Sequence, residues 1–272
     1  MTTQLETVEP GAKKRIDFSS DLFTRWIPRF LGYAAFLGLW ELASGTVIKA
    51  RLLPSPWKIL KEMGAILTSG EFGRNFGSTT QKLFLGYAIA YALGVTIGIL
   101  MARPWGDGFF RDWVVVMLNT PGLIFVLLCV VTFGLSKWSP VVAVIITSYP
   151  FVTINVAEGV RALPKDLIDM GRSFRVGGIQ RLRRIIIPFL APYLFTALRY
   201  GFSVAWKVVT LSEVFGASSG IGFQFRLEFQ LFSISGMLAW IFIFFAFALF
   251  LEKVLLQAGE KRFFRWRRVG KL

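Results

Sequence analysis

The chain has 272 residues, of which 54% are hydrophobic and only 17% are charged, a composition typical of membrane proteins rather than ordinary soluble ones. Its net charge of +15 does not indicate nucleic-acid binding, because the basic residues lie between apolar runs rather than on one polar domain. There is no histidine, a single cysteine and no G-x-x-x-x-G-K-[ST] phosphate loop. We therefore expect no catalytic residue, metal or cofactor bound by this chain itself.

The N-terminal arm, residues 1–28, is polar and mixed in charge. A cleavable signal peptide would begin with basic residues directly against a short apolar core. Here Lys13, Lys14 and Arg15 lie well before the first apolar run, and Glu6 and Glu9 precede them. We interpret the arm as an uncleaved cytoplasmic segment.

Six apolar runs follow, each close to the roughly 20 residues that a helix needs to cross a bilayer. They cover residues 29–48, 83–102, 113–135, 139–157, 189–214 and 232–251. The sequence therefore predicts an all-α polytopic membrane protein with one six-helix transmembrane domain over 29–251. An even number of spans places both termini on the same side.

The orientation follows from the distribution of Lys and Arg between the spans. The arm, the link after the second span, the loop 158–188 and the tail together carry 20 of these residues, against 8 on the opposite side. Because basic loops stay in the cytoplasm, the loop 158–188 and both termini are predicted to be cytoplasmic. The tail 252–272 interleaves aromatic and basic residues, which favours an anchor on anionic lipid over binding of single-stranded nucleic acid.

Two short motifs in the first half of the chain predict local structure. A periplasmic amphipathic helix is predicted after Pro54-Ser55-Pro56, because Trp57, Leu60, Met63 and Leu67 recur at helical spacing. In the second span, Gly94 and Gly98 permit close helix approach, and packing within the chain is favoured over a dimer contact.

Two proline segments are predicted to break spans at membrane depth. They are Asn119-Thr120-Pro121-Gly122 in the third span and Ser148-Tyr149-Pro150 in the fourth. Such breaks persist only where protein or water satisfies the freed backbone groups. They either line a solute path or merely bend the helices.

The loop 158–188 is the longest polar segment between two apolar runs. Leu167, Met170, Gly171 and Phe174 recur at spacings of three and four, which predicts a short helix with one apolar face. Leu163-Pro164 is expected to start this helix and Gly177-Gly178 to end it. A second short helix is expected to carry Ile179, Leu182 and Ile185 on one side. Such a pair fits a groove in another protein, or rests on lipid headgroups as an interfacial helix.

This loop resembles that of the transmembrane subunits of ABC-type importers, which carry the pattern E-A-A-x3-G-x9-I-x-L-P. Asp169, Met170 and Gly171 stand where E-A-A is expected, and the closing positions are Ile185, Ile187 and Pro188. Arg175 stands at the glycine, a departure because glycine permits a turn that arginine disfavours. Gly177-Gly178 is expected to supply the bend instead.

Other segments are similar to the branch of that family that handles nitrate, sulfonates and taurine, and the resemblance covers roughly residues 40–250. These segments are Trp40-Glu41, the LPSP motif, the GYAIAYALGVTIGILM run, Pro121 with Phe133-Gly134, Trp206 with Glu213, and residues 219–223.

The resemblance implies a type I ABC importer permease fold in a bacterial inner membrane. It also implies a dimer of permease subunits (a homodimer is the simplest case), a periplasmic solute-binding protein, and two ATPase subunits that use ATP and magnesium. The ATPases would dock on the loop, whose coupling residues would be Leu167, Asp169, Met170, Gly171, Phe174, Arg175, Ile185 and Pro188. A secondary transporter and a membrane-embedded enzyme are the alternatives; the first should show related halves or paired broken helices with ionisable coupling groups.

The fifth span carries the charges that point to a solute path, since charge within a span is costly. Arg199, Ser203, Trp206, Thr210 and Glu213 follow one another at steps of three and four residues, so they form one polar and aromatic stripe along the helix. Lys207 lies at the edge of this stripe. The pathway candidates are Pro121, Arg199, Ser203, Trp206, Lys207, Thr210 and Glu213. Glu213 is placed at the periplasmic end, where the cost of charge is small. Lys207 either lies beside a passing anion, snorkels to the membrane interface, or pairs with Glu41 or Glu213.

Overall fold

A computed structural model describes residues 27–253, and every regular element in that part of the chain is a helix. The arm, except its last residues, and the tail beyond residue 253 lie outside the described residues. The pattern of contacts divides the chain into two compact units, with the boundary in the sequence between Lys58 and Ile59. Each unit is described by itself.

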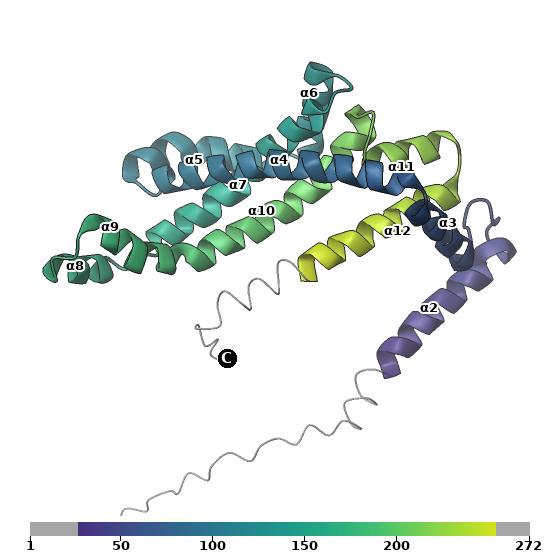
Figure 1. Cartoon of the computed structure of the whole chain (residues 1–272), viewed down its shortest axis with the longest axis horizontal. Helices are drawn as coiled ribbons and strands as arrows, with labels where there is room; N and C mark the ends of the chain where they lie inside the picture. The colour runs from purple at the N-terminus through teal and green to yellow at the C-terminus, as the bar shows by residue number, and fades with distance from the viewer. Residues whose placement is uncertain (1–26, 254–272) are drawn as a thin grey trace, which may run out of the picture. The chain divides into compact units, whose positions relative to one another are not determined.

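The first unit contains helix α2, Ile27–Thr46, which occupies the predicted first span (Figure 1). The helix is kinked at Ser44 and Gly45, where Gly45 has a φ of 87°. The chain then folds back along the helix end. Trp40 Nε1 donates to the carbonyl of Pro54 at 3.1 Å, and Ser44 Oγ donates to that of Leu53 at 2.7 Å.

Helix α3, Pro56–Thr68, confirms the predicted amphipathic segment after the LPSP motif. Proline suits the first helical position because its missing N–H would have no partner there. The Ser55 hydroxyl caps the helix, accepting from the Lys58 N–H at 3.3 Å.

The core of the second unit is formed by three long helices that pack against one another: α4, Gly70–Met101; α7, Trp138–Arg161; and α10, Ile187–Gly216 (Figure 1). A Cβ added at Gly94 would lie 2.5 Å from the Cβ of Val152, and one at Gly98 would lie 2.7 Å from the carbonyl of Thr153. Both partners belong to α7, so the interpretation of these glycines as packing within the chain is confirmed.

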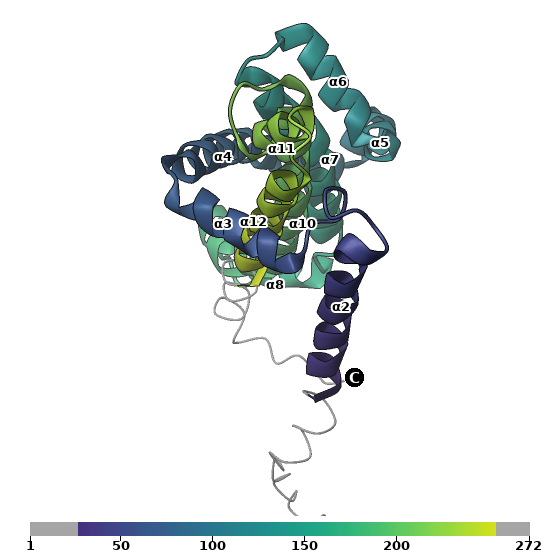
Figure 2. The same cartoon turned by 90° about the vertical axis from the view of Figure 1, so that its right-hand side faces the viewer.

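The third predicted span is broken where expected. Helix α5, Pro104–Asn119, and helix α6, Gly122–Phe133, meet at an angle of 93°, and α6 leaves the line of α5 in Figures 1 and 2. The predicted break in the fourth span is wrong, because α7 continues through Pro150 without interruption. Pro150 is buried in the core, where the packing of α4 and α10 on α7 compensates for the lost backbone hydrogen bond.

The predicted sixth span is helix α12, Ile234–Phe250, preceded by helix α11, Ile221–Gln230, which the hydrophobic pattern did not predict. Trp206 of α10 stacks on Phe244 of α12, with ring centroids 5.1 Å apart and planes at 6°. This contact places Trp206 in the core, where it joins α10 to α12.

The count of six spans is not confirmed. Four described helices are long and apolar enough to cross a bilayer, and five segments qualify if the bent pair α5 and α6 forms one span. Helix α2 is not among them, since Arg29 and Glu41 lower its mean hydropathy. The predicted fold class, an all-α protein that spans the membrane several times, is confirmed.

The polar loop contains helix α8, Lys165–Ser173, and helix α9, Gly178–Arg181. The expectation of a separate second helix is wrong. α9 passes through a π-helical turn, η2, Leu182–Ile186, directly into α10, so 39 residues from Gly178 to Gly216 form one continuous helical run. The second half of the loop is therefore the end of a core helix.

Candidate functional site

The polar loop is fastened to the core where it leaves α7. Arg161, the last residue of α7, donates from Nη2 to the carbonyl of Met101 at the end of α4, at 2.8 Å. The same guanidinium pairs with Asp107 in the first turn of α5, and Arg111 lies 3.4 Å from that carboxylate. These contacts join the start of the loop to the turn between α4 and α5.

The turn that ends α8 lies at Arg175, which adopts a φ of 55°. The Val176 N–H donates to the carbonyl of Gly171 at 2.9 Å and the Arg175 N–H to that of Arg172 at 2.8 Å, the two bonds of a Schellman cap. The expectation that Gly177-Gly178 supplies this bend is wrong, because Gly177 has an ordinary φ of −56°. Arg175 itself takes the conformation that glycine would adopt most easily.

We expect Arg175→Gly to stabilise the end of α8 by about 1 kcal/mol, because a side chain in the left-handed region costs about 1–2 kcal/mol. Amide hydrogen exchange over residues 165–176 should slow about fivefold. Arg172→Gly, which removes an arginine from the regular part of the same helix, should accelerate exchange by a similar factor. Equal acceleration in both variants would contradict this account of the turn.

Gly171 lies inside the loop rather than on its outer face. It is buried, and an added Cβ would lie 3.2 Å from Ile185 Cδ1 and 3.3 Å from Arg181 Cδ. The expectation that Gly171 belongs to the docking face is therefore corrected: this position lets α8 approach the start of the α10 run. Leu167 is half-buried, whereas Asp169 is exposed and pairs with Arg172 at 3.1 Å.

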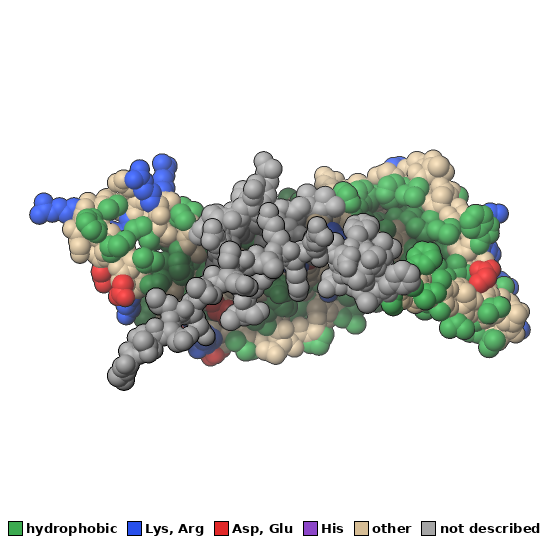
Figure 3. All heavy atoms as spheres, turned by 90° about the horizontal axis from the view of Figure 1, so that it is seen from below, with side chains coloured by type: hydrophobic (Ala, Val, Ile, Leu, Met, Phe, Trp, Pro, Cys, Tyr) green, Lys and Arg blue, Asp and Glu red, His purple; other side chains and the backbone are tan. Residues whose placement is uncertain are grey.

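Large apolar side chains nevertheless remain uncovered on the loop. Phe174 is 76% exposed and Ile179 is 74% exposed, with Met170 and Leu182 close to half exposed. We call these four residues the apolar patch. Basic side chains gather at the same end of the molecule (Figure 3): Arg172, Arg175, Arg183 and Arg184 are all exposed. Of the remaining predicted coupling residues, Ile185 is half-buried and Pro188 is exposed.

The predicted pathway stripe on α10 does not form one surface. Trp206, Thr210 and Glu213 are buried inside the chain, whereas Lys207 is exposed and Ser203 is half-buried. Arg199 Nε lies 2.9 Å from Glu252 Oε1, so this arginine forms an ion pair at the end of α12. Pro121 is exposed at the break between α5 and α6.

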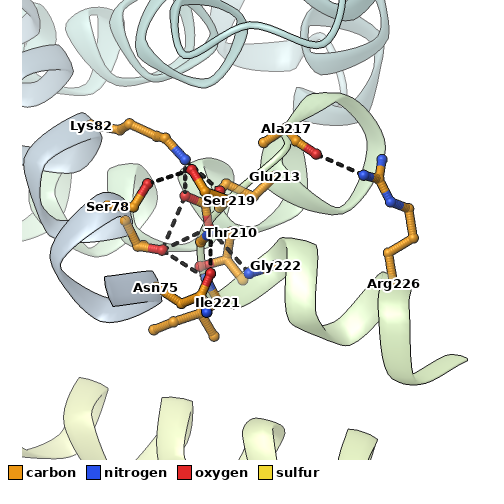
Figure 4. Close-up of polar contacts among 12 residues, drawn as sticks. Asn75, Ser78, Lys82, Thr210, Glu213, Ala217, Ser219, Ile221, Gly222 and Arg226 are labelled. Atoms are coloured by element: carbon orange, nitrogen blue, oxygen red, sulfur yellow. Dashed lines mark hydrogen bonds and ion pairs between the residues drawn. The ribbon is translucent and has the colours of Figure 1, made fainter. Parts of the chain in front are cut away.

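Glu213 forms the centre of a buried polar network (Figure 4). Its side chain is 0% exposed, and Lys82 Nζ of α4 lies 2.8 Å from Oε1. The Thr79 hydroxyl donates to the same carboxylate, at 2.8 Å from Oε2, and the Gly222 N–H donates to Oε2 at 3.1 Å. The expectation that charge costs little at Glu213 is wrong, since the carboxylate is buried and depends on these partners.

The same network also forms hydrogen bonds with the backbone of residues 219–221, at the start of α11. The Gly220 N–H donates to Asn75 Oδ1 and the Ile221 N–H to Thr79 Oγ1, both at 2.9 Å. Lys82 Nζ also donates to the carbonyl of Ser219 at 2.6 Å. Side chains of α4 and α10 thus satisfy the first N–H groups of α11, which would otherwise lack intrahelical partners.

The sequence placed Lys82 in a loop, because the apolar run of the second span begins one residue later. Helix α4 begins at Gly70, so the polar residues before the run are helical as well. Asn75, Thr79 and Lys82 follow one another at steps of four and three, a periodicity that identifies one helix face. This signal was available in the sequence.

Residues 90–265 match the family described as binding-protein-dependent transport system inner membrane component. The chain belongs to this family of permeases. Known relatives of the permease are similar over most of their lengths. It is 25% identical over 244 residues to the aliphatic sulfonates transport permease protein SsuC of Bacillus subtilis, covering 89% of this chain and 88% of that protein.

Two further relatives fall in the same branch. The taurine transport system permease protein TauC of Escherichia coli is 24% identical over 84% of each chain. The nitrate import permease protein NrtB of Leptolyngbya laminosa is 25% identical over 73% of this permease and 74% of that protein. The predicted resemblance to the nitrate, sulfonate and taurine branch is confirmed.

Solved structures support the fold. A bacterial ABC transporter involved in the import of the polysaccharide alginate aligns with a TM-score of 0.57 at 15% identity, covering 94% of this permease and 98% of that chain. An inward-facing MetNI methionine ABC transporter aligns with a TM-score of 0.51 at 18% identity, covering 78% of this permease and 97% of that chain. The type I ABC importer permease fold is therefore confirmed at the level of overall architecture.

The family fixes the class of function. The protein is the membrane-spanning permease subunit of an ABC importer, and the secondary transporter and the membrane-embedded enzyme are not favoured. Permeases of this family work with ATPase subunits, which hydrolyse ATP, and with a solute-binding protein.

Proposed function

We propose that two identical copies of this permease form one translocation path in a bacterial inner membrane, with both termini in the cytoplasm. The arm 1–28 and the tail 252–272 flank the transmembrane domain 29–251. A periplasmic binding protein delivers a small solute, of the kind for which the sulfonate, nitrate and taurine relatives are named. Two ATPase subunits, with ATP and magnesium, power the import from the cytoplasmic side.

The apolar patch on the polar loop is the observation that carries this proposal. Exposed Phe174 and Ile179 lie on a segment that also carries four exposed arginines, Arg172, Arg175, Arg183 and Arg184. Large apolar side chains with a polar rim are typical of protein interfaces, where aromatic residues contribute most of the binding energy. The loop also joins α7 to α10, two of the three core helices, so a partner bound there would act directly on the core.

The test introduces a charge into the patch. We expect Phe174→Asp and Ile179→Asp each to reduce binding-protein-stimulated ATP hydrolysis by at least on the order of tenfold, because a buried aromatic or aliphatic anchor contributes about 2 kcal/mol or more to an interface. The assembled complex would be reconstituted in liposomes and stimulation measured with the binding protein present. The melting temperature of the permease alone should not change, since both side chains are exposed.

Gln180→Asp is the matched control, because it adds the same charge at an exposed polar position between Ile179 and Arg181. It should retain both the ATPase subunits and the stimulation. If Phe174→Asp and Ile179→Asp kept full stimulation, the patch would not be the docking surface. If they instead weakened only the association of the loop with anionic vesicles, the interfacial-helix alternative would replace this proposal.

A further inference from the structure

The polar loop is attached to the core at two places, the end of α7 and the start of α10 (Figure 1). At the first, α7 ends at Arg161 and residues 162–164 form a short non-helical link, in which Pro164 has an extended ψ of 129°. Arg161 itself is bound to the carbonyl of Met101 and to Asp107. The core side of this link is therefore fixed, and the link itself lacks helical hydrogen bonding.

The second attachment is an irregular stretch of helix. In the π-helical turn η2, the Ile187 N–H donates to the carbonyl of Leu182, five residues earlier. Pro188 follows at once, and Pro192 lies four residues farther on. A proline within a helix supplies no N–H, and its ring clashes with the carbonyl four residues earlier. Because residues four apart lie on one face, two successive turns each lack a hydrogen bond on the same side of the helix.

The residues before this stretch pack together as one body. An added Cβ at Gly171 of α8 would lie 3.2 Å from Ile185 Cδ1 and 3.3 Å from Arg181 Cδ. The Val176 N–H closes the turn at the end of α8, because it donates to the carbonyl of Gly171 at 2.9 Å. Packing this close leaves α8 little freedom relative to the helical turns opposite it. We call residues 165–185 the loop body.

The residues after the irregular stretch are held in the core. An added Cβ at Gly159 of α7 would lie 2.6 Å from Tyr193 Cβ, so α7 and α10 are in close contact there. Tyr91 Oη of α4 donates to the carbonyl of Leu194 at 3.1 Å. Tyr87, one turn earlier on α4, donates in the same way to the next turn of α10, at 2.6 Å. From Tyr193 onward, α10 is thus fixed to both of its core neighbours.

We propose that residues 186–192 form a hinge about which the loop body turns relative to the core. Of these seven residues, all of which the structure describes, only Leu190 is buried, so few core contacts stiffen the stretch. Hinges are short segments at the ends of elements that absorb a change in backbone angles between two rigid parts. The link 162–164 is the second flexible attachment, so the loop body can turn as one piece.

This inference rests on the proposed function and adds a moving part to it. The ATPase subunits change their arrangement as they bind and hydrolyse ATP, and the loop body follows them while the core helices turn through a different angle. The hinge keeps the loop body docked at both ends of the cycle. A stiff connection would favour one end and slow the passage to the other.

The test stiffens the hinge at one position. Pro192→Ala restores a backbone N–H that can donate to the carbonyl of Pro188, and alanine favours a helix interior. The variant should bind the ATPase subunits as the wild type does, because the loop body is unchanged. Binding-protein-stimulated ATP hydrolysis in liposomes should nevertheless fall on the order of tenfold. Its melting temperature should not fall, a combination that a merely structural role of Pro192 would not produce.

Two controls separate stiffness from other effects. Pro192→Gly also removes the ring, but glycine keeps the turn flexible, so stimulated hydrolysis should stay close to that of the wild type. Pro104→Ala replaces a proline at the first residue of α5, where an N–H gains no intrahelical partner, and should have no effect.

Amide hydrogen exchange observes the hinge directly in the purified permease. In the wild type, the amides of residues 186–191 are expected to exchange faster than those of residues 194–205 by on the order of tenfold or more. Pro192→Ala should slow the exchange of residues 186–191, and Pro192→Gly should slow it less.

Exchange of residues 186–191 as slow as that of residues 194–205 in the wild type would overturn the inference, because no hinge would exist. Full stimulated hydrolysis in Pro192→Ala, or an equal loss in Pro192→Ala and Pro192→Gly, would overturn the role of the hinge and leave the proposed function intact. Loss of ATPase binding in Pro192→Ala would also overturn it, since the residue would then belong to the docking surface. Failure of the wild-type permease to support binding-protein-stimulated ATP hydrolysis would instead count against the proposed function itself.

Discussion

Lys82→Met is expected to lower the melting temperature of the purified permease by on the order of 10 °C. The substitution leaves the carboxylate of Glu213 buried without its cation, and removing one partner of a buried ion pair costs about 3–5 kcal/mol. It also frees the carbonyl of Ser219, which accepts from Lys82 Nζ at 2.6 Å. Thermal unfolding in detergent, followed by size-exclusion chromatography, measures the effect.

The double variant Lys82→Met/Glu213→Gln should recover much of that loss, because no uncompensated charge remains. Arg172→Met is the surface control. Its pair with Asp169 is 67% and 64% exposed, so its removal should change stability by less than about 1 kcal/mol. If the double variant were no more stable than Lys82→Met alone, the loss of stability would not come from an uncompensated charge on Glu213.

Gly220→Ala is expected to have an effect of similar size at the start of α11. Gly220 has a φ of 121°, a conformation that only glycine adopts readily, and an added Cβ would overlap the carboxylate of Glu213. Lys82, Thr79 and the Gly222 N–H all donate hydrogen bonds to that carboxylate, so it cannot move aside without losing them. Strain and the lost hydrogen bonds together should cost about 3 kcal/mol or more.

Gly108→Ala is the matched control, because Gly108 lies within helix α5 and nothing lies within 4 Å of an added Cβ. It should leave the melting temperature unchanged or raise it slightly, as alanine favours a helix interior. The variants would be compared by thermal unfolding and by the yield of folded protein. A Gly220→Ala permease as stable as Gly108→Ala would contradict the close approach of α11 to Glu213.

Much of the architecture could be predicted from local patterns. Proline placed the start of α3 and the break at Pro121, and the spacing of Leu167, Met170 and Phe174 identified helix α8. These features depend on residues near one another in the chain, where periodicity and turn chemistry are informative. The start of α4 was missed because its first three turns are polar, and hydropathy locates only the apolar part of a helix.

The pairings could not be predicted, because they join distant residues. Lys82 and Glu213 are 131 positions apart, and nothing local distinguishes Glu213, which is buried, from Lys207, which is exposed on the same helix. The positive φ of Arg175 could not be predicted for a different reason. Its intrinsic preference opposes a positive φ, yet the two capping hydrogen bonds and the packing of Gly171 on Ile185 impose that turn.

The most direct test of the central claim, that the polar loop of this permease couples it to ATPase subunits, is a cross-link from the loop. A photoreactive amino acid would replace Ile179, which is 74% exposed in the apolar patch, and a parallel variant would carry it at Phe229, which is 68% exposed at the end of α11. Irradiation of the assembled complex is predicted to join the ATPase subunit to position 179 and not to position 229. Cross-linking of the ATPase at 229 alone, or only lipid adducts at 179, would contradict the account.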